Sequence, residues 1–431
     1  MRVLLIGAYG FIGSEIARAL IAAGHDVRGF GRDVAHGRRI LPMVDWVRGD
    51  LADFVDPGHW AAALSGADAV INASGLLQDE PGHGVVRVQQ QAIGQLAVAA
   101  GSAGMARFVQ ISAANADADA PSVFLTSKAA ADAMVREFGP AHVILRPGLV
   151  IGRNAYGGTE LIRIAAAMPG ITLLPGGTGP IQCIGMDDLV AAVLRAIDPA
   201  GPEGSFDLVE ARSRTLGEIV ALHRDWLGLP ATSSTLLLPA WSMRMTGAVA
   251  NGLGWLGWRS PLRTNALLSL HHGVSGDAGQ AEALLGRPAL PLEAVLAVRP
   301  AGRQDRLAAR LGLLLPLMLL SLFLMWFGSA LFTAFDFEAA TALLIEGGLP
   351  PAAARLLGGG GALVDGALAL MLLHRRTVRP ALAGTVLVTL AYLAGASLIR
   401  PDFWSDPLAP LLKTLPAAML SLACLALTER R

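Results

Sequence analysis

Tyrosine, cysteine and charged residues are all scarce in this sequence. Three tyrosines and two cysteines occur in 431 residues, and 34 basic side chains are balanced by 34 acidic ones. Cys183 and Cys424 lie far apart, with no spacing suited to zinc, so we expect both to be reduced and expect no metal site. The balanced charge gives no indication of a nucleic-acid partner.

Hydrophobic residues, by contrast, are abundant. They make up 53% of the chain against 16% charged residues, and the mean hydropathy is +0.51. This composition is too apolar for an ordinary soluble enzyme of this size. Part of the chain should therefore lie in a lipid bilayer.

Short apolar runs alternate with helix-length amphipathic stretches up to about residue 198. The runs are RVLLIG, DVRGFG, DAVINASG, RFVQIS and VILRPGLVIG. This βαβ rhythm predicts a doubly wound parallel Rossmann sheet of the α/β class. Residues 205–300 are irregular and helical, and we expect them to form a small cap, so that the first domain covers residues 1–300.

The most apolar part of the expected cap is residues 236–258. It contains Pro239, Arg244 and several glycines. These interruptions favour a cap helix, or a helix lying on the membrane surface, over a membrane span.

Four apolar segments follow, at residues 311–332, 353–373, 380–399 and 408–427. Each has about the 20 residues that a helix needs to cross a bilayer core. They predict an all-α membrane domain of four transmembrane helices over residues 301–431. Arginines precede the first segment, join the second to the third and close the chain, so both the amino-terminal domain and the carboxyl terminus should face the cytoplasm.

Two ionisable residues fall within these segments. Asp365 is near the middle of the second, and Lys413 is a little way inside the fourth. Ionisable groups at bilayer depth often mark a pathway, a partner or a ligand. The two residues could form an ion pair, or Asp365 could titrate in a polar cavity while Lys413 extends to the interface.

The stretch IGAYGFIG follows the first predicted strand and opens the first predicted helix. Gly7 permits a tight turn, Gly10 lets the backbone approach a pyrophosphate, and Gly13 allows close packing of helix on strand. The helix amino terminus supplies N–H donors and positive potential. We expect the whole loop to contact a dinucleotide: Gly7, Tyr9, Gly10, Phe11, Ile12 and Gly13.

The end of the second strand indicates which dinucleotide binds. An NAD site usually has an acid there, but DVRGFGRD places Arg32 after Gly31. A guanidinium suits a 2′-phosphate, so NADP(H) is favoured and NAD(H) remains possible; otherwise Arg32 is a solvated residue beside Asp33. Asp50 could bond the adenine amino group or cap a helix.

Further motifs occur in the order found in one enzyme family. They are GDL at residues 49–51, NASG at 72–75, Ser112, SK at 127–128, LRPGLVIG at 145–152 and IQCIGMDDL at 181–189. With the glycine loop, residues 1–300 resemble the extended and atypical short-chain dehydrogenases/reductases, including the branch of the nucleotide-binding accessory subunit of respiratory complex I. The resemblance implies further cofactor contacts from Leu51, Ala73, Ser74, Gly75, Lys128 and Pro147. PDFWSDPLAPLLKTLP, at residues 401–416, resembles the DoxX-like family of membrane proteins.

The resemblance also implies a catalytic set that is incomplete here. In active members a tyrosine transfers the proton, a lysine lowers the tyrosine pKa and holds the nicotinamide ribose, and a serine orients the substrate. Lys128 and Ser112 match the last two roles, although Ser112 could instead bond the backbone at a strand end. The tyrosine position is Phe124, which has no proton to give. Tyr156 alone lies on the substrate side and could be a relocated acid.

Together these patterns predict a protein of the bacterial inner membrane that binds NAD(P)(H) on its cytoplasmic side. It would act on or sense an apolar membrane partner, a quinone or an isoprenoid lipid, with weak or no catalysis. Two alternatives are an active NADPH-dependent oxidoreductase or epimerase with a relocated proton donor, and an assembly or scaffold protein of a respiratory complex with a structural nucleotide.

Overall fold

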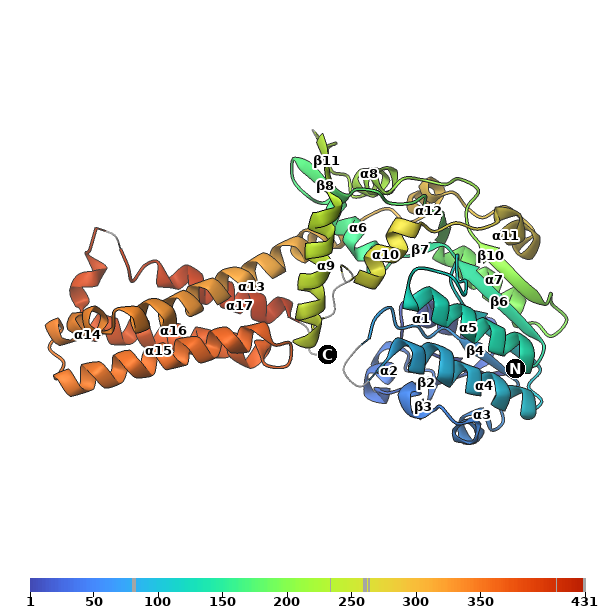
Figure 1. Ribbon diagram of the computed structural model, residues 1–431, viewed down its shortest axis with the longest axis horizontal. Coiled ribbons are helices and arrows are strands. Elements are labelled where there is room, and N and C mark those ends of the chain that lie inside the picture. The colour runs from blue at the N-terminus through green and yellow to red at the C-terminus, as the bar shows by residue number, and fades with distance from the viewer. Residues whose placement is uncertain (80–82, 233, 259–261, 263, 408, 429–431) are drawn as a thin grey trace. The chain divides into compact units, whose positions relative to one another are not determined.

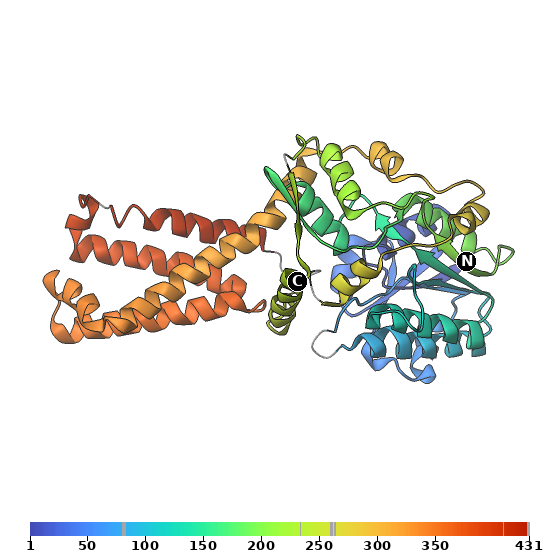
Figure 2. The ribbon, with the colours of Figure 1, turned by 45° about the horizontal axis from the view of Figure 1, so that its top comes forward.

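The computed structural model describes residues 1–79, 83–232, 234–258, 262, 264–407 and 409–428. The chain forms two compact units (Figures 1 and 2). The first is Met1–Gly252 with Ser260–Ala309, and the second is Leu253–Arg259 with Arg310–Arg431.

A seven-stranded parallel sheet forms the centre of the first unit (Figure 1). Its order is β10-β6-β5-β4-β1-β2-β3, and every neighbouring pair is parallel, so the predicted doubly wound fold is confirmed. The chain reverses its winding direction between β1 and β4, the place where such folds bind ligands. The strands are β1 Arg2–Ile6, β2 Asp26–Gly31, β3 Asp45–Arg48, β4 Ala69–Asn72, β5 Arg107–Ile111, β6 His142–Pro147 and β10 Gly204–Leu208.

Strand alternation assigns the apolar side chains of β1 to two cores. Val3 and Leu5 join one core cluster, while Leu4 and Ile6 join the other. Each fully buried aliphatic side chain contributes about 1.5–3 kcal/mol by leaving water. Helices α1 Gly13–Ala22, α7 Met186–Ala196 and α11 Ala278–Leu285 cover the first face, and α4 Ala92–Ser102 and α5 Val123–Phe138 cover the second.

Several short elements connect the strands of this sheet. Helix α2 Val34–Ile40 follows β2, and α3 Ala61–Leu64 precedes β4. The 3-10 turns are η1 Leu51–Asp53 and η2 Pro57–Trp60, and a π-helical turn, η3 Val86–Gln91, runs into α4.

The cap is built from different segments of the chain than the expected range of residues 205–300. Its core joins α6 Gly158–Ala166 to α8 Leu216–Trp226 and α12 Leu292–Val298. β10 lies inside the expected cap range but is the edge strand of the main sheet. Two small parallel sheets pair β7 Leu149–Ile151 with β9 Cys183–Gly185, and β8 Ile171–Pro175 with β11 Ser234–Leu238; α9 Ala240–Trp255 and α10 Thr264–His272 follow.

The second unit is helical, and three helices whose sequences enter it are long and apolar enough to cross a membrane. They are α13 Arg303–Phe335, α15 Pro351–Leu373 and α16 Val378–Ile399. Helix α14 Phe337–Glu346 follows α13, and the turn η4 Pro401–Trp404 follows α16.

The fourth predicted span is shorter than expected. Helix α17 covers only Thr414–Leu427, 14 residues, or about 21 Å of rise against a bilayer core of about 30 Å. Pro407 and Pro410 precede it, and proline lacks the N–H that a helix interior needs, so the helix begins late. By length, the described chain has three candidate spans rather than four.

Of the two alternatives for Asp365 and Lys413, the ion pair is not observed in the described part of the chain. Lys413 is exposed directly before α17. Asp365 is buried and accepts hydrogen bonds from Ser329 and Tyr392. Neutral hydroxyls, rather than a cation, are therefore the observed partners of this carboxyl group.

Candidate functional site

The glycine loop between β1 and α1 leaves no room for side chains. Gly7 has a φ of +75°, and a Cβ there would lie 2.9 Å from the carbonyl oxygen of Ala73. A Cβ at Gly13 would lie 2.1 Å from the carbonyl oxygen of Gly7. The Gly10 N–H donates to the same oxygen at 2.9 Å and closes the turn. Glycine is therefore required at positions 7 and 13, as the sequence predicted.

The amino terminus of α1 faces this loop without a capping side chain. Ile12 occupies the cap position and has no side-chain oxygen to offer, while the main-chain oxygens of Gly10 and Ile12 accept the N–H groups of Ser14 and Glu15 at 3.0 and 3.1 Å. The one acid of the first turn, Glu15, is paired with Arg18 at 2.9 Å. A helix dipole and a tight glycine turn are features that hold a pyrophosphate, so these residues fit a dinucleotide.

Tyr9 is directed to the adenosine end of the loop. Its ring stacks on Trp46, with centroids 5.6 Å apart and planes at 29°, and meets His36 edge-on. A Cβ at Gly31 would lie 2.5 Å from the Tyr9 ring, so any larger residue at the end of β2 would have to displace that ring.

The ends of β2 and β3 bring two predicted residues together with one that was not predicted. His83 places Nε2 2.7 Å from Oδ2 of Asp50 and 2.9 Å from Nη1 of Arg32. Nε2 of His83 cannot donate a hydrogen to Asp50 and accept one from Arg32 at the same time. We assign its N–H to the Asp50 carboxylate, which can only accept. Asp33 caps α2 through the His36 N–H, and the Arg32 guanidinium, whose side chain is 45% exposed, lies 4.0 Å from Oδ2 of Asp50.

Asp50 also caps the turn η1, accepting from the Ala52 N–H at 3.0 Å. Burial opposes ionisation, but the hydrogen bonds from His83 and Ala52 and the charge of Arg32 prevail and lower the pKa of Asp50. The capping alternative is thus observed, while the second oxygen faces His83. A lone histidine in the stretch DEPGHGV gives no pattern that sequence reasoning could use.

A buried polar network fixes the loop after β4. The Asn72 side chain donates to Gln110 at 2.9 Å and accepts the Ser74 hydroxyl at 2.6 Å. Gln89 accepts the Leu76 N–H and donates to Ser127 on α5. This network positions Ala73, Ser74 and Gly75 at the crevice between β1 and β4.

Lys128 is buried beside this loop. Its Nζ donates to the carbonyl oxygen of Ser74 at 2.9 Å and to that of Ile111 at 2.8 Å. Burial lowers the Lys128 pKa to about 8, and the charge of Asp132 offsets part of the effect. An ammonium has three donors, so one N–H is still available to a ribose hydroxyl.

Ser112 bonds a side chain rather than the backbone alternative that the sequence allowed. Its Oγ donates to Oδ2 of Asp132 at 2.6 Å, and both residues are buried. Burial raises the pKa of Asp132, against the hydrogen bond from Ser112 and the charges of Lys128 and Arg146. Asp132 was not predicted as a site residue, although it follows Lys128 by four residues on α5 and so shares its face.

The sequence places Phe124 where the resemblance implies a tyrosine. Phe124 lies one turn before Lys128 and is partly buried. Tyr156, the candidate replacement, lies between β7 and α6 and is 56% exposed.

Three remaining predicted contacts are also placed by the fold. Leu51 begins η1 and packs on the second core, and Pro147 ends β6 and accepts the Ala114 N–H. The ring of Phe11 lies against Gly152, just after β7.

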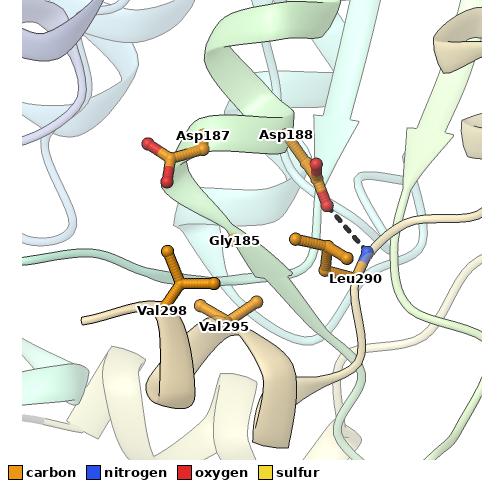
Figure 3. Close-up of a pocket in the computed structure, with 6 residues that line it drawn as sticks. All are labelled: Gly185, Asp187, Asp188, Leu290, Val295 and Val298. Atoms are coloured by element: carbon orange, nitrogen blue, oxygen red, sulfur yellow. Dashed lines mark hydrogen bonds between the residues drawn. The ribbon is translucent and has the colours of Figure 1, made fainter. Parts of the chain in front are cut away.

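A separate pocket near the start of α7 is structural (Figure 3). Gly185, Asp187, Asp188, Leu290, Val295 and Val298 line it. Asp188 accepts the Leu290 N–H at 2.8 Å and pairs with Arg287, so its carboxylate is satisfied by the chain itself.

Two known families match the two halves of the chain. The NAD(P)H-binding family matches residues 7–167, and the DoxX-like family matches residues 321–422. Among solved structures, the Bordetella bronchiseptica enzyme WbmG in complex with NAD is similar, with a TM-score of 0.52 and 18% identity over 72% of this chain and 93% of that chain.

Several curated relatives match part of the chain. An NAD(P)H azoreductase of Xenophilus azovorans is 27% identical over 249 residues, 57% of this chain and 80% of the relative. A 3-diazoavenalumate denitrifying reductase of Streptomyces sp is 30% identical over 229 residues, 46% of this chain and 72% of the relative. The mitochondrial NADH dehydrogenase (ubiquinone) 1 alpha subcomplex subunit 9 of Arabidopsis thaliana is 27% identical over 208 residues, 46% of this chain and 50% of the relative.

Sheet order and glycine loop define a Rossmann-type dinucleotide-binding domain of the short-chain dehydrogenase kind. The chain belongs to the NAD(P)H-binding proteins of this kind and continues into a DoxX-like membrane domain. Both predicted resemblances are confirmed.

Proposed function

We propose that this protein holds a nicotinamide cofactor on the cytoplasmic side of the bacterial inner membrane and acts on, or senses, an apolar membrane partner. The partner would be a quinone or an isoprenoid lipid, reached through the DoxX-like domain. The observation that carries the proposal is the pair on α5: Lys128 retains a donor for a ribose hydroxyl, while Phe124 replaces the proton-transferring tyrosine.

Each part of the first unit has a defined task in this proposal. The glycine loop and the start of α1 bind the pyrophosphate, and the buried Asn72–Gln110 pair keeps the crevice in shape. When bound, the nicotinamide supplies or accepts a hydride. Without a tyrosine, no side chain on α5 supplies the accompanying proton, so turnover is slow or absent.

The preferred cofactor in this proposal is NADP(H). Arg32 stands where an acid would bind the ribose of NAD, and His83 adds a second nitrogen next to it. A 2′-phosphate would accept charge-assisted bonds from the guanidinium and compete with Asp50 for it.

Two experiments test this proposal: identification of the nucleotide that co-purifies with the full-length protein, and measurement of NADPH oxidation by the Phe124→Tyr variant. We expect retained NADP(H), slow NADPH oxidation by wild type with a quinone acceptor, and a gain of about 10²–10⁴-fold in Phe124→Tyr, the usual contribution of a positioned acid. Phe138→Tyr, at the end of the same helix, is the matched control and should gain nothing. Rapid turnover by wild type that Phe124→Tyr leaves unchanged would contradict the proposal.

An active oxidoreductase is the second candidate, because two of the relatives carry reductase names. In that case Tyr156 or a substrate group provides the proton, as it would in an epimerase. Tyr156→Phe would then abolish turnover while leaving nucleotide retention intact.

A third candidate is a scaffold with structural nucleotide, in keeping with the complex I subunit among the relatives. It predicts tight retention without turnover and a co-purifying membrane complex.

A further inference from the structure

A buried carboxyl group joins three helices of the DoxX-like unit. Asp365 on α15 is 3% exposed. Ser329 on α13 donates to its Oδ2 at 2.6 Å, and Tyr392 on α16 donates to its Oδ1 at 2.8 Å. Among the residues that the structure describes, no cation forms a salt bridge with it. A carboxyl group held by two hydroxyls still has lone pairs for a further donor.

An unsatisfied donor lies next to this cluster. Trp326 precedes Ser329 by three residues, so the two side chains share a face of α13. Its indole is 3% exposed, its ring centroid is 6.4 Å from that of Tyr392, and its Nε1–H has no hydrogen-bond partner among the described residues. Buried donors are nearly always paired, so this N–H indicates a partner that is not part of the chain.

The cluster is reachable from outside the helical unit. Tyr392 is 43% exposed although its hydroxyl bonds the buried Asp365. Asp365 lies about 12 Å of helix rise from the end of α15, well within the span, so the surroundings of Tyr392 at this depth are lipid. Gly361, one turn before Asp365, leaves room there, because a Cβ would lie 3.0 Å from the Tyr392 hydroxyl.

We propose that Asp365, Tyr392, Ser329 and Trp326 bind the oxygen-bearing head group of an apolar membrane molecule that enters from the lipid. A hydroxyl would donate to the carboxyl group of Asp365, a carbonyl would accept the Trp326 N–H, and the apolar tail would remain in the bilayer. This inference rests on the apolar partner of the proposed function and assigns its binding site. A quinone carbonyl and an isoprenoid alcohol both carry an oxygen that can accept the Trp326 N–H, and only the alcohol can also donate to Asp365.

Equilibrium binding to the full-length protein in lipid nanodiscs tests the site, with decylubiquinone and farnesol as separate probes. We expect Asp365→Asn to weaken farnesol binding, and Tyr392→Phe to weaken binding of the recognised probe, roughly 5- to 10-fold, the effect of one lost hydrogen bond. Decylubiquinone has no hydroxyl to donate to Asp365, so its binding should depend on Trp326 instead. If the carbonyl is the recognised group, Trp326→Phe should weaken the binding of decylubiquinone more than the binding of farnesol. Preference for one probe identifies the source of the head group.

Thr389→Val is the matched control. Thr389 is buried on α16 near Tyr392 in sequence, but its hydroxyl is satisfied by the Thr385 carbonyl of its own helix. It should therefore leave the affinity for either probe unchanged. A purely structural role for Asp365 would lower the thermal stability of its variant but leave affinity unchanged.

Nucleotide retention is measured in the same samples, which separates this site from the proposed function. Loss of probe binding with retained NADP(H) supports the site. Wild type that binds neither probe, or variants that bind as wild type does, would overturn the site while leaving the nucleotide proposal standing. If Asp365→Asn fails to fold, Tyr392→Phe and Trp326→Phe decide the question.

Discussion

Lys128 and Phe124 stand one helical turn apart on α5, and their implications for chemistry are opposite. The ammonium group is tied to two strand-end carbonyls and keeps one donor free. The phenyl ring differs from a tyrosine by a single oxygen atom. In the proposed function, Lys128 serves nucleotide binding while Phe124 leaves the tyrosine's proton transfer unfilled.

Lys128 should give the protein a distinctive dependence of stability on pH. Its pKa is lowered to about 8 in the folded state, against about 10.4 when unfolded. Between these values the unfolded chain binds more protons, so stability rises with pH in that window. Relative to Lys128→Met, wild type should gain about 3 kcal/mol between pH 8 and pH 10.5.

Denaturation of the nucleotide-free, full-length protein at a series of pH values measures this difference. Lys413→Met is the control, since Lys413 is exposed and should show a profile parallel to wild type. A Lys128→Met profile that is also parallel would disprove the effect.

Steric and positional arguments recovered part of the site from the sequence. The requirement for glycine at positions 7 and 13 follows from a single tight turn. Arg32 and Asp50 lie close together because parallel strands end at one edge of a sheet. His83 and Asp132 could not be assigned in this way. The position of His83 depends on a loop after β4, and the partner of Asp132 is a strand-end serine distant in sequence.

Helix α9 exposes a row of apolar side chains. Trp241, Met245 and Val249, spaced four residues apart, are all exposed, while Gly247 and Ala250 are buried. Arg244 is the one charged residue of the helix. An apolar stripe with aromatic residues and a basic neighbour is typical of helices that lie at a membrane surface.

We expect lipid to cover this stripe in the intact protein. A spin label at Met245→Cys, in nanodiscs, should be shielded from a water-soluble relaxation agent and accessible to oxygen. The control is Met43→Cys, whose side chain is exposed in the turn before β3 and should remain accessible to water. The two native cysteines are buried, so they should compete little for the label. Equal water accessibility at both positions would refute the expectation.

Element lengths were the least predictable feature of the membrane half. Counting apolar residues gave a fourth span, but the observed helix starts only at Thr414, after two prolines. In the cap, the irregular pattern hid β10, because an edge strand of five residues carries too little periodicity to be recognised.

At the scale of the whole molecule, the side of the membrane on which the carboxyl terminus lies depends on whether the short helix α17 crosses the bilayer. Arg379, at the start of α16, donates to the carbonyl oxygens of Leu425 and Thr428 at the end of α17. The end of α17 is therefore level with the basic residues that join α15 to α16, which the positive-inside rule assigns to the cytoplasm.

A green fluorescent protein fused after the last residue should accordingly fold in the cytoplasm and fluoresce. The control fusion ends before α17, at residue 407, and should be exported and dark. A dark full-length fusion beside a fluorescent truncated one would reverse the proposed orientation.

The order of elements along the chain also has a consequence in time. The last strand of the sheet, β10, ends at Leu208, about 95 residues before α13 begins at Arg303. At synthesis rates of about 5–20 residues per second, this gives the sheet roughly 5–20 s before the first span is made. All seven strands are thus available for pairing in water before any part of the chain needs a membrane.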